Sequence, residues 1–308
     1  HGVELLDWSR LGEWARGRSA RVSVAHAAAG LRRAAGFDAV FSDGEHVGVP
    51  LALGMRARRL QRPHLMLGHH LTNGAKRQVF RWLRPQARIS RVLVHSRRQA
   101  ELAPAQLGIP RDRVRFVPYC ADTAFWPAAP QSSEALVVSA GREHRDYATL
   151  ADACRELPVR VFIAAGSLFS PSAAHTRPES WPAGFETGFA GHVALRDWYA
   201  SAAVVAVPLV PTDFQAGVTT ILEAMSMARA VVVSATAGQR DIVEDGVTGV
   251  LVPPGDAGAL REALQRLLAS PAERARLGAN ARAAVEERFS LDRYASCLAR
   301  HLEELAAA

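Results

Sequence analysis

Residues 213–238 read DFQAGVTTILEAMSMARAVVVSATAG and join a buried helix to a buried strand. Apolar residues recur through residues 218–225 at the spacing of a helix inside a core, and the run RAVVVSA follows as an apolar strand. Gly217 comes directly before this helix, and Glu223 stands among its apolar residues. A carboxylate in an otherwise buried helix has to serve either the helix dipole or a ligand.

Apolar runs of this kind alternate with helical stretches along most of the chain. The first half holds them at residues 37–43, 62–70 and 89–96, and the second half at residues 135–141, 159–166, 202–209, 229–235 and 249–254. Near-continuous apolar strands that alternate with helices indicate parallel sheets covered on both faces. The segment 117–135, rich in Pro, Ala and Ser, separates the two sets and is interpreted as a linker.

The sequence therefore predicts an α/β fold of two doubly wound, Rossmann-like domains that face a cleft. At 308 residues the chain is long enough for two domains of ordinary size. We place an N-terminal domain at residues 1–126 and a C-terminal domain at residues 127–290. A C-terminal helix at residues 291–308 is expected to return toward the first domain.

Charge is divided unevenly between the two halves. Residues 1–126 hold 21 Lys+Arg against 9 Asp+Glu, and residues 127–308 hold 16 against 21. A GC-rich genome explains why Lys76 is the only lysine, but it does not explain why positive charge gathers in one half. We expect the first half to face an anionic partner, either a membrane surface or a phosphorylated acceptor. Nucleic acid is not expected, because the basic half lacks a recognised motif and holds few aromatic residues.

Composition also bears on the compartment. No apolar run reaches the roughly 20 residues that a membrane-spanning helix needs. The three cysteines are far apart in sequence, which argues against a disulfide framework or a zinc site and fits a reducing cytoplasm. We therefore expect a cytoplasmic protein, with the inner face of the membrane as one location. Since the chain begins at His1, a targeting segment ahead of it stays an open question.

Two arginines follow a strand at the edge where parallel sheets bind ligands. In SAGREHRDY, residues 139–147, Arg142 and Arg145 come directly after the apolar run. The planar fork of arginine suits phosphate oxygens. A pair of ordinary surface arginines is the alternative.

The helix start in the opening segment offers further ligand groups. Gly217 lets backbone approach a ligand closely, and the amides of residues 218–220 are donors at a helix N-terminus, where phosphate binds. Glu223 lies about one turn further on, and a carboxylate there accepts hydrogen bonds from the vicinal diol of a ribose. The alternative is that Glu223 only favours the helix dipole.

Two weaker signals flank this helix. In FAGHVALRDWYASA, residues 189–202, the positions Gly191, His192 and Val193 would end a strand near a nucleotide base, with a plain loop as the alternative. The glycine-rich segment 235–256 brings backbone close to the cleft, an arrangement that serves structure more often than function.

Together these segments resemble one family. The run TTILEAMSMARAVVVSATAGQRDIVEDGVTGVLVPPGD closely resembles the C-terminal domain of GT-B retaining glycosyltransferases, the family 4-like, bacterial group 1 enzymes. SAGREHRDYATL resembles the family's G-R-x-x-x-K segment, and RVRFVPYCADTAFWP resembles its interdomain stretch. The resemblance covers most of residues 62–290.

The resemblance implies a retaining, metal-independent hexosyltransferase that needs no cofactor. A nucleotide-diphosphate sugar would bind the C-terminal domain and an acceptor the N-terminal domain. Arg142 and Arg145 would contact the diphosphate, and Glu223 the ribose. The donor site so implied comprises Arg142, Arg145, Gly191, His192, Val193, Gln215, Ala216, Gly217, Val218, Thr219 and Glu223.

Three positions depart from the family pattern. Gln215 stands where the family usually places a glutamate near the donor sugar, and an amide cannot serve as a carboxylate nucleophile. This favours a mechanism in which donor and acceptor react on one face. Arg145 replaces a lysine and keeps its charge. The glycine-rich loop expected after the first strand is not visible before HGVELLDW, so we expect an incomplete or reduced N-terminal domain.

Histidines mark the corresponding edge of the first domain. LGHHLTNG, residues 67–74, matches the strand end where the family carries a histidine over the sugar; the register favours His70 and then His69. Glu45, His46 and His69 are acceptor-side candidates, and a core or loop histidine is the alternative. The catalytic candidates are His70, Gln215, Arg142 and Arg145.

A basic segment follows these histidines directly. Residues 74–88, GAKRQVFRWLRPQAR, interleave large apolar residues with five cations, which suits an anionic membrane surface and a lipid-linked or phosphorylated acceptor. An ordinary core-facing helix with a solvated basic side is the alternative.

The sequence thus predicts a retaining glycosyltransferase that moves a sugar from a nucleotide-diphosphate sugar to an unidentified acceptor. Two alternatives stay open. One is a catalytically inactive sugar-nucleotide binder or partner subunit, and the other is a GT-B sugar-nucleotide epimerase or hydrolase.

Overall fold

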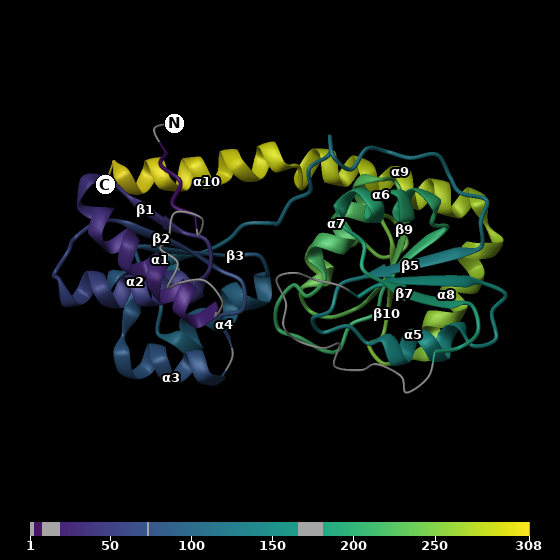
Figure 1. Cartoon of the computed structure of the whole chain (residues 1–308), viewed down its shortest axis with the longest axis horizontal. Helices are drawn as coiled ribbons and strands as arrows, with labels where there is room; N and C mark the ends of the chain where they lie inside the picture. Colours follow the sequence, from purple (N-terminus) through teal and green to yellow (C-terminus); the bar gives the residue numbers. More distant parts are fainter. Residues whose placement is uncertain (1–2, 8–18, 73, 166–180, 308) are drawn as a thin grey trace. The chain divides into compact units, whose positions relative to one another are not determined.

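The structure is a computed structural model that describes residues 3–7, 19–72, 74–165 and 181–307. The chain divides into two compact units (Figure 1). Unit 1 comprises His1–Val117 with Ala295–Ala308, and unit 2 comprises Pro118–Tyr294. In the described parts of the chain, every helix is too short or too polar to cross a lipid bilayer.

Unit 1 is an α/β layer structure around a parallel sheet. Its described elements are α1 (Ser19–Arg33), η3 (Ala34–Gly36), β1 (Val40–Ser42), α2 (Glu45–Ala57), β2 (His64–Gly68), α3 (Gly74–Leu83), η4 (Pro85–Arg88), β3 (Arg91–Val94), α4 (Arg97–Leu107), η5 (Arg111–Arg113) and β4 (Val114–Phe116). Within the described residues the strands pair in the order β1-β2-β3-β4, and every pair is parallel. Met66 and Val92 of this sheet pack with Phe80 of α3 and Leu107 of α4.

Unit 2 repeats the alternation on a larger sheet. Its described elements are β5 (Leu136–Ala140), α5 (Tyr147–Cys154), β6 (Arg160–Ala164), β7 (Phe185–Gly188), α6 (His192–Ser201), β8 (Val204–Val207), α7 (Val218–Ser226), β9 (Ala230–Ser234), η6 (Gln239–Asp241), β10 (Val250–Val252), α8 (Ala257–Ala269) and α9 (Pro271–Arg288). The described strands are all parallel, in the order β10-β9-β8-β5-β6-β7. Strand order reverses between β5 and β8, and ligands bind at such a switch point.

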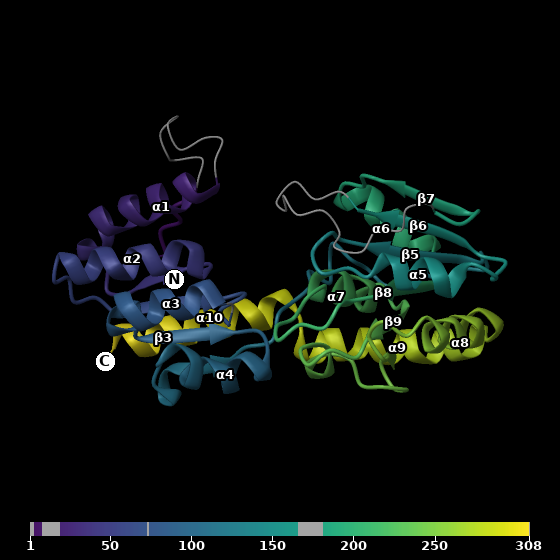
Figure 2. The ribbon, with the colours of Figure 1, turned by 90° about the horizontal axis from the view of Figure 1, so that it is seen from below.

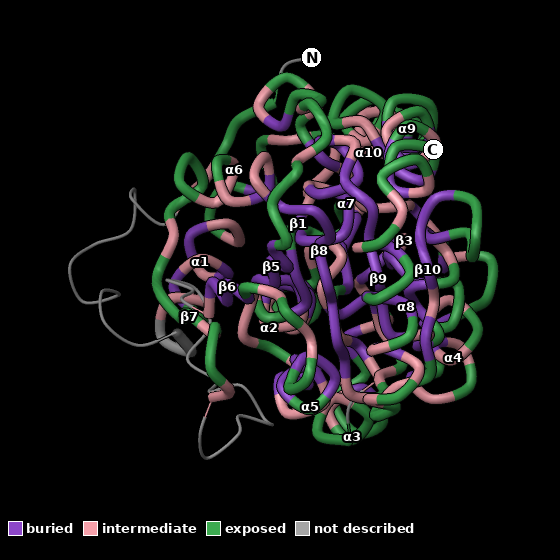
Figure 3. The backbone as a smooth tube through the Cα atoms, turned by 90° about the vertical axis from the view of Figure 1, so that its right-hand side faces the viewer, coloured by how far each residue is buried: buried purple, intermediate pink, exposed green. Residues whose placement is uncertain are grey.

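Alternating side chains explain why this sheet carries helices on both faces. Along β8, Val205 and Val207 join a buried cluster with α6 and α7, whereas Val204 and Ala206 join a second cluster with α5 and α8. Successive strand residues point to opposite faces, so a run of valines needs a helical layer on each side. Apart from β7 at the edge of the sheet, the strands of unit 2 are accordingly mostly buried in Figure 3.

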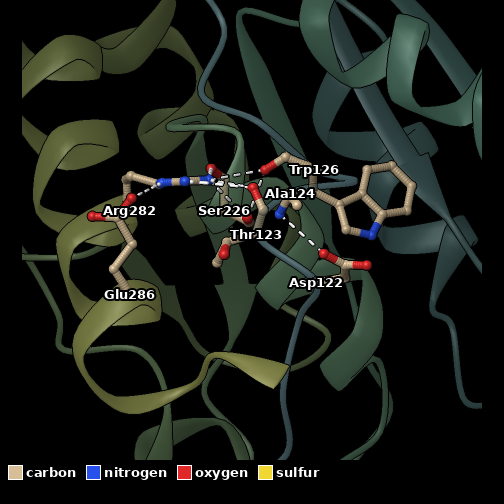
Figure 4. Close-up of polar contacts among 7 residues, drawn as sticks. All are labelled: Asp122, Thr123, Ala124, Trp126, Ser226, Arg282 and Glu286. Carbon is tan, nitrogen blue, oxygen red and sulfur yellow. Dashed lines mark hydrogen bonds and ion pairs between the residues drawn. The ribbon is translucent and has the colours of Figure 1, made fainter. Parts of the chain in front are cut away.

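The linker predicted over residues 117–135 packs onto unit 2. The Arg282 guanidinium of α9 donates to the backbone oxygens of Thr123 and Trp126 and to that of Ser226 at the end of α7 (Figure 4). Glu286, one turn further along α9, receives a bond of 2.6 Å from Arg282 Nε. Because the linker carbonyls are held by unit 2, the boundary lies at Val117 and not after residue 126.

A second arginine and a tryptophan hold the same stretch. Arg229 is fully buried and donates to the carbonyls of Ala129 and Pro130. Trp126 is 4% exposed and belongs to the core of unit 2. A segment rich in Pro and Ala is therefore ordered here by contacts that its own composition does not reveal.

The last helix, α10 (Leu291–Ala306), belongs to unit 1 from residue 295 onward. Arg91 of β3 donates to Glu304 at 2.6 Å and lies 2.7 Å from His301 Nδ1. These contacts tie the end of the chain to the first unit.

Candidate functional site

The switch point of unit 2 is built from glycines. β5 ends at Gly141, whose φ is 101°, and α7 begins after Gly217, whose φ is 73°. Both values lie in the left-handed region that favours glycine. Gly217 offers no side-chain cap, and the first backbone bond of the helix runs from the Ile221 amide to the Gly217 carbonyl at 3.1 Å. The amides of residues 218–220 therefore point out from the helix N-terminus.

Arg145 lies directly beneath these glycines and is 3% exposed. Its Nε donates to the Ala140 carbonyl at 2.7 Å, one Nη to the Glu143 carbonyl at 3.0 Å and the other Nη to Thr220 Oγ1 at 3.2 Å. Burial lowers the pKa of Arg145 from its usual range. Arginine starts so high that the guanidinium stays a cation.

Only glycine lets the backbone lie on this guanidinium. A methyl group at Gly141 would come within 2.4 Å of one Arg145 Nη, and a methyl at Gly217 within 3.0 Å of the other and 2.9 Å of Val207. Such distances are far below ordinary contact. The cation and the helix N-terminus thus make one electropositive spot at the sheet edge.

Glu223 stands half-buried on α7, beyond these groups. Burial raises the pKa of Glu223 to about 8, against the opposing effects of the Tyr199 hydroxyl and the Arg145 charge. The carboxyl group is therefore largely protonated at neutral pH. A nearby hydroxyl-rich ligand would change that balance, since hydrogen bonds to the charged form favour it.

Two glutamines fix the loop before α7. Gln215 Nε2 donates to the Gly238 carbonyl at 3.1 Å, and Gln239 Nε2 donates to the Ala216 carbonyl at 2.5 Å. Gln239 is fully buried, and Thr236 donates to its amide oxygen. The sequence interpretation took residues 235–256 as backbone close to the cleft that serves structure more often than function, and it did not name Gln239. A buried amide after an apolar strand and a small-residue turn was the available signal.

Gln215 itself is 8% exposed, and its Oε1 is buried without a hydrogen-bond partner among the described residues. Its amide nitrogen is committed to the loop, so the side chain is oriented by Gly238. A methyl at Gly238 would lie 2.8 Å from the Phe214 carbonyl oxygen.

Unit 1 holds a separate polar cluster at the carboxyl ends of β1 and β2. Glu45, the first residue of α2, accepts from the His69 amide at 2.9 Å, from the His70 amide at 3.3 Å and from Lys76 Nζ. Lys76 also donates to the His70 carbonyl at 2.5 Å. Burial alone would raise the pKa of Glu45, but the charge and hydrogen bond of Lys76 and the hydrogen bonds from backbone amides together outweigh it, and the pKa falls to about 2.

His69 and Asp43 form the exposed part of this cluster. His69 Nε2 lies 3.2 Å from Asp43 Oδ1. Burial lowers the pKa of His69, but the Asp43 hydrogen bond together with the Asp43 and Glu45 charges outweighs burial and raises the pKa overall. A methyl at Gly44 would come within 2.4 Å of the His46 ring, so glycine is required between Asp43 and the histidines.

The structure distinguishes the two predicted histidines. His69 pairs with Asp43 and lies 5.7 Å, ring to ring, from His95. Glu45 and Lys76 bind the backbone amide and carbonyl of His70. Burial lowers the pKa of His46, another predicted acceptor-side residue. Asp43 was not among the predicted site residues, although it follows the apolar run at residues 37–43.

Residues 134–270, most of unit 2, match the family model described as Glycosyl transferases group 1. The second unit is a group 1 glycosyl transferase domain. A D-inositol 3-phosphate glycosyltransferase of Xylanimonas cellulosilytica is 31% identical over 236 residues, which cover 67% of this chain and 55% of that protein. The chain thus spans about half the length of this curated relative.

Solved structures extend the likeness beyond the group 1 glycosyl transferase domain. Sucrose-phosphate synthase from Thermosynechococcus elongatus superposes with a TM-score of 0.76 at 22% identity, covering 93% of this chain and 78% of its own. The Anabaena protein HepE, solved in complex with UDP and glucose, gives 0.75 at 18% identity, with coverage of 90% and 81%. The chain therefore has the GT-B fold that the sequence predicted.

Within the group 1 glycosyl transferase domain, the predicted donor residues divide into two sets. The structure brings Arg145, Gly217 and Thr220 together at the switch point, with Arg142 half-buried in the turn after β5. The prediction that residues 191–193 end a strand is wrong. β7 ends at Gly188, and Gly191 is the N-cap of α6, followed by exposed His192 and Val193. The helix prevails because residues 192–201 pack through buried Tyr199.

Proposed function

We propose that this protein transfers a sugar from a nucleotide-diphosphate sugar to an acceptor hydroxyl, with retention of the anomeric configuration and without a metal ion. One observation carries the proposal: the Arg145 guanidinium lies beneath Gly141, which follows β5, and Gly217, which precedes α7. A diphosphate on this turn would meet helix N-terminal amides and a buried cation. The match of residues 134–270 to group 1 glycosyl transferases supports the same ligand.

In the proposed reaction, the bond between the sugar and the diphosphate breaks and negative charge collects on the leaving diphosphate. Arg145 and the amides of residues 218–220 oppose this charge, which stabilises the transition state more than the ground state. Arg142, in the turn that follows Gly141, is proposed to reach the outer phosphate oxygens. The loop positions Gln215 and Ala216 would flank the sugar.

Glu223 is proposed to bind the ribose diol as a carboxylate. Its pKa of about 8 without ligand means that such binding releases a proton near neutral pH. Residues 191–193 at the start of α6 are proposed to read the base through backbone groups. HepE was solved with UDP, so uracil is the first base to test.

Retention is proposed from the resemblance to retaining group 1 enzymes. Since the Gln215 amide supplies no carboxylate nucleophile, retention would require the acceptor oxygen to bond to the sugar on the face from which the diphosphate departs, with the hydroxyl proton passing to the departing phosphate oxygen. His70 and His69 of unit 1 are the proposed acceptor-side groups, and Asp43 would favour the protonated form of His69.

The acceptor is proposed to be anionic or lipid-linked, at the inner face of the membrane. The basic balance of residues 1–126 supports this class. D-inositol 3-phosphate, named for a relative, is the first anionic polyol to test.

Gln215 also favours a second candidate, a sugar-nucleotide binder without catalytic activity. The absence of a carboxylate at this position is the observation that supports it. Donor binding without turnover would distinguish this candidate from the enzyme.

Donor binding is tested by thermal shift with UDP, GDP, ADP and their sugars. We expect at least one to raise the melting temperature, because a ligand bound only by the folded state stabilises it. Glu223→Ala should weaken the binding of that ligand. Glu244→Ala, on a loop of the same unit, is the control and should leave the binding unchanged. If none of these nucleotides or nucleotide sugars raised the melting temperature, the proposed donor site would be wrong.

Turnover is then followed with the donor that binds, with and without D-inositol 3-phosphate and with EDTA present. Product formation unaffected by EDTA, with an unchanged anomeric coupling constant by NMR, supports the full proposal. Release of nucleotide diphosphate without an acceptor would instead indicate a hydrolase.

A further inference from the structure

A stretch of unit 1 contains cations and no carboxylates. Residues 46–100 hold twelve Lys+Arg and not one Asp or Glu. Glu45, immediately before this stretch, is 7% exposed and bound to Lys76, so it screens little of this charge. No described carboxylate forms an ion pair with Arg56, Arg81 or Arg84. Arg56, Arg81 and Arg84 therefore contribute positive charge that no described carboxylate pairs with, whereas Lys76, Arg91 and Arg98 have carboxylate partners.

The ends of α2 and α3 gather part of this charge in one place. An Nη of Arg56, on the last turn of α2, donates to the Leu83 carbonyl at the end of α3 at 2.7 Å. The two helices lie next to one another within unit 1 in Figures 1 and 2. Arg84 follows with a left-handed φ of 49° and turns the chain. Arg58, the C-cap of α2, and Arg81 are also exposed.

Two large apolar side chains stand among these arginines. Trp82 is 72% exposed and Leu83 is 50% exposed. Phe80, on the same helix, is fully buried, so α3 already satisfies the core without them. The Arg81 guanidinium lies 5.4 Å from the centre of the Trp82 ring. Exposed Trp and Leu side chains next to arginines are typical of a surface that binds a lipid membrane.

We infer that the joined ends of α2 and α3, with Trp82 and Leu83 at their centre, dock on the surface of an anionic lipid bilayer. Trp82 suits the depth of lipid headgroups, where its ring is part apolar and part polar. Arginines extend their apolar stems along the same boundary and keep their heads at the phosphates. A nucleic acid would use the charges but would leave Leu83 without a role. The inference concerns unit 1 alone and does not depend on the transfer reaction.

Vesicle flotation of the full chain tests this surface. Vesicles of phosphatidylcholine alone are compared with an equal mixture of phosphatidylcholine and phosphatidylglycerol. We expect flotation only with the anionic mixture, and its reversal at high salt, because surface charge is screened. Equal flotation with both vesicle types, or with neither, would overturn the inference.

Matched variants locate the contact. Arg81→Gln with Arg84→Gln should weaken vesicle binding about 25-fold, since each cation near an anionic surface contributes about fivefold. Trp82→Ala should weaken it about tenfold through lost apolar burial. Phe189→Ala and Arg155→Gln are the controls, because these side chains are 63% and 57% exposed on unit 2. Controls that lose as much binding as the Trp82 variant would contradict the assignment.

A random-sequence RNA is the competing probe. It should bind more weakly than the anionic vesicles, and Trp82→Ala should leave that weak binding unchanged. Tighter binding to RNA than to vesicles would overturn the lipid assignment.

Discussion

Two glutamates, one in each unit, stand near the start of a helix that follows a parallel strand, and they differ in ionisation. Burial would raise the pKa of both. Glu45 of unit 1 nevertheless has a pKa of about 2, because Lys76 and the amides of His69 and His70 bind its oxygens. Glu223 of unit 2 has a pKa of about 8, because burial outweighs the Tyr199 hydroxyl and the Arg145 charge.

The two glutamates differ because the neighbouring cations have different hydrogen-bond partners. The Lys76 ammonium donates to the Glu45 carboxylate and to the His70 carbonyl. Arg145 donates to the carbonyls of Ala140 and Glu143 and to Thr220. Glu45 is therefore a carboxylate that holds a loop, whereas Glu223 is a neutral acid whose state a ligand can change. Glu45 thus has a structural role, whereas the ionisation of Glu223 can change when a ligand binds.

Removal of the cation from unit 1 should have the largest effect. Lys76→Met leaves the buried Glu45 carboxylate without its counter-charge, and we expect a loss of about 3–5 kcal/mol in the free energy of unfolding at pH 7. Chemical denaturation measures it. Arg77→Met, the neighbouring exposed position, is the control and should change stability by less than about 0.5 kcal/mol.

The same pair has a defined acid dependence. Since the folded pKa of Glu45 is lowered, its stabilisation is full above the ordinary value of 4.5 and is lost as pH falls toward about 2. The difference between wild type and Lys76→Met should therefore shrink in acid. A constant difference across this window would mean that the lysine acts by packing alone.

Removal of the cation from unit 2 should act on ligand binding. Arg145→Met should weaken the binding of a nucleotide diphosphate by about 100-fold. This corresponds to the loss of about 2–3 kcal/mol of binding free energy from charge-assisted interactions. It should also raise the pKa of Glu223, because the Arg145 charge lowers it. Calorimetry measures the affinity, with Arg145→Lys expected between the two.

Thr220→Val is the control that separates the loss of the Arg145 charge from a general loss of folding. It removes the hydroxyl that accepts from Arg145 and leaves the charge in place, so affinity should fall only several-fold. If a folded Arg145→Met protein bound the nucleotide diphosphate with wild-type affinity, the proposal that the cation of unit 2 serves ligand binding would be wrong.

The neutral state of Glu223 predicts a pH dependence. If the ribose selects the carboxylate, affinity for a nucleotide sugar should rise up to about tenfold per pH unit and level off above about 8. Without ligand the sign is opposite: a raised carboxyl pKa makes unit 2 less stable as pH rises from 4.5 toward 8. Glu223→Gln should flatten both curves, and calorimetry in two buffers should detect the released proton.

The sequence predicted the framework of both units because buried parallel strands are continuous apolar runs. It recovered β5, β6, β8, β9 and β10, but not β7, whose residues Phe185–Gly188 are mostly exposed and lack an apolar pattern. It also gave Gly217 and Arg145 as site residues from local spacing. That the guanidinium lies under the glycines depends on how β5 and α7 meet, which no local pattern records.

Long-range pairs were the least predictable part. Glu45 and Lys76 are 31 residues apart, and Arg282 holds linker carbonyls 156 and 159 residues away. The composition of residues 117–135 indicates a free linker, and only the tertiary contacts attach it to unit 2. Likewise, the pair of His69 and Asp43 joins residues 26 positions apart, which no local pattern records.

The smallest effect is expected at this exposed end of unit 1. Asp43→Asn should lower the pKa of His69, because the hydrogen bond and charge of Asp43 are the largest effects that oppose burial, and NMR titration of the ring measures it. The stability at stake is well under about 1 kcal/mol, since both side chains are largely exposed. It is present below the ordinary pKa of 6.5 and lost as pH rises through the folded value. An unchanged His69 titration would mean that Asp43 does not favour the charged form of this ring.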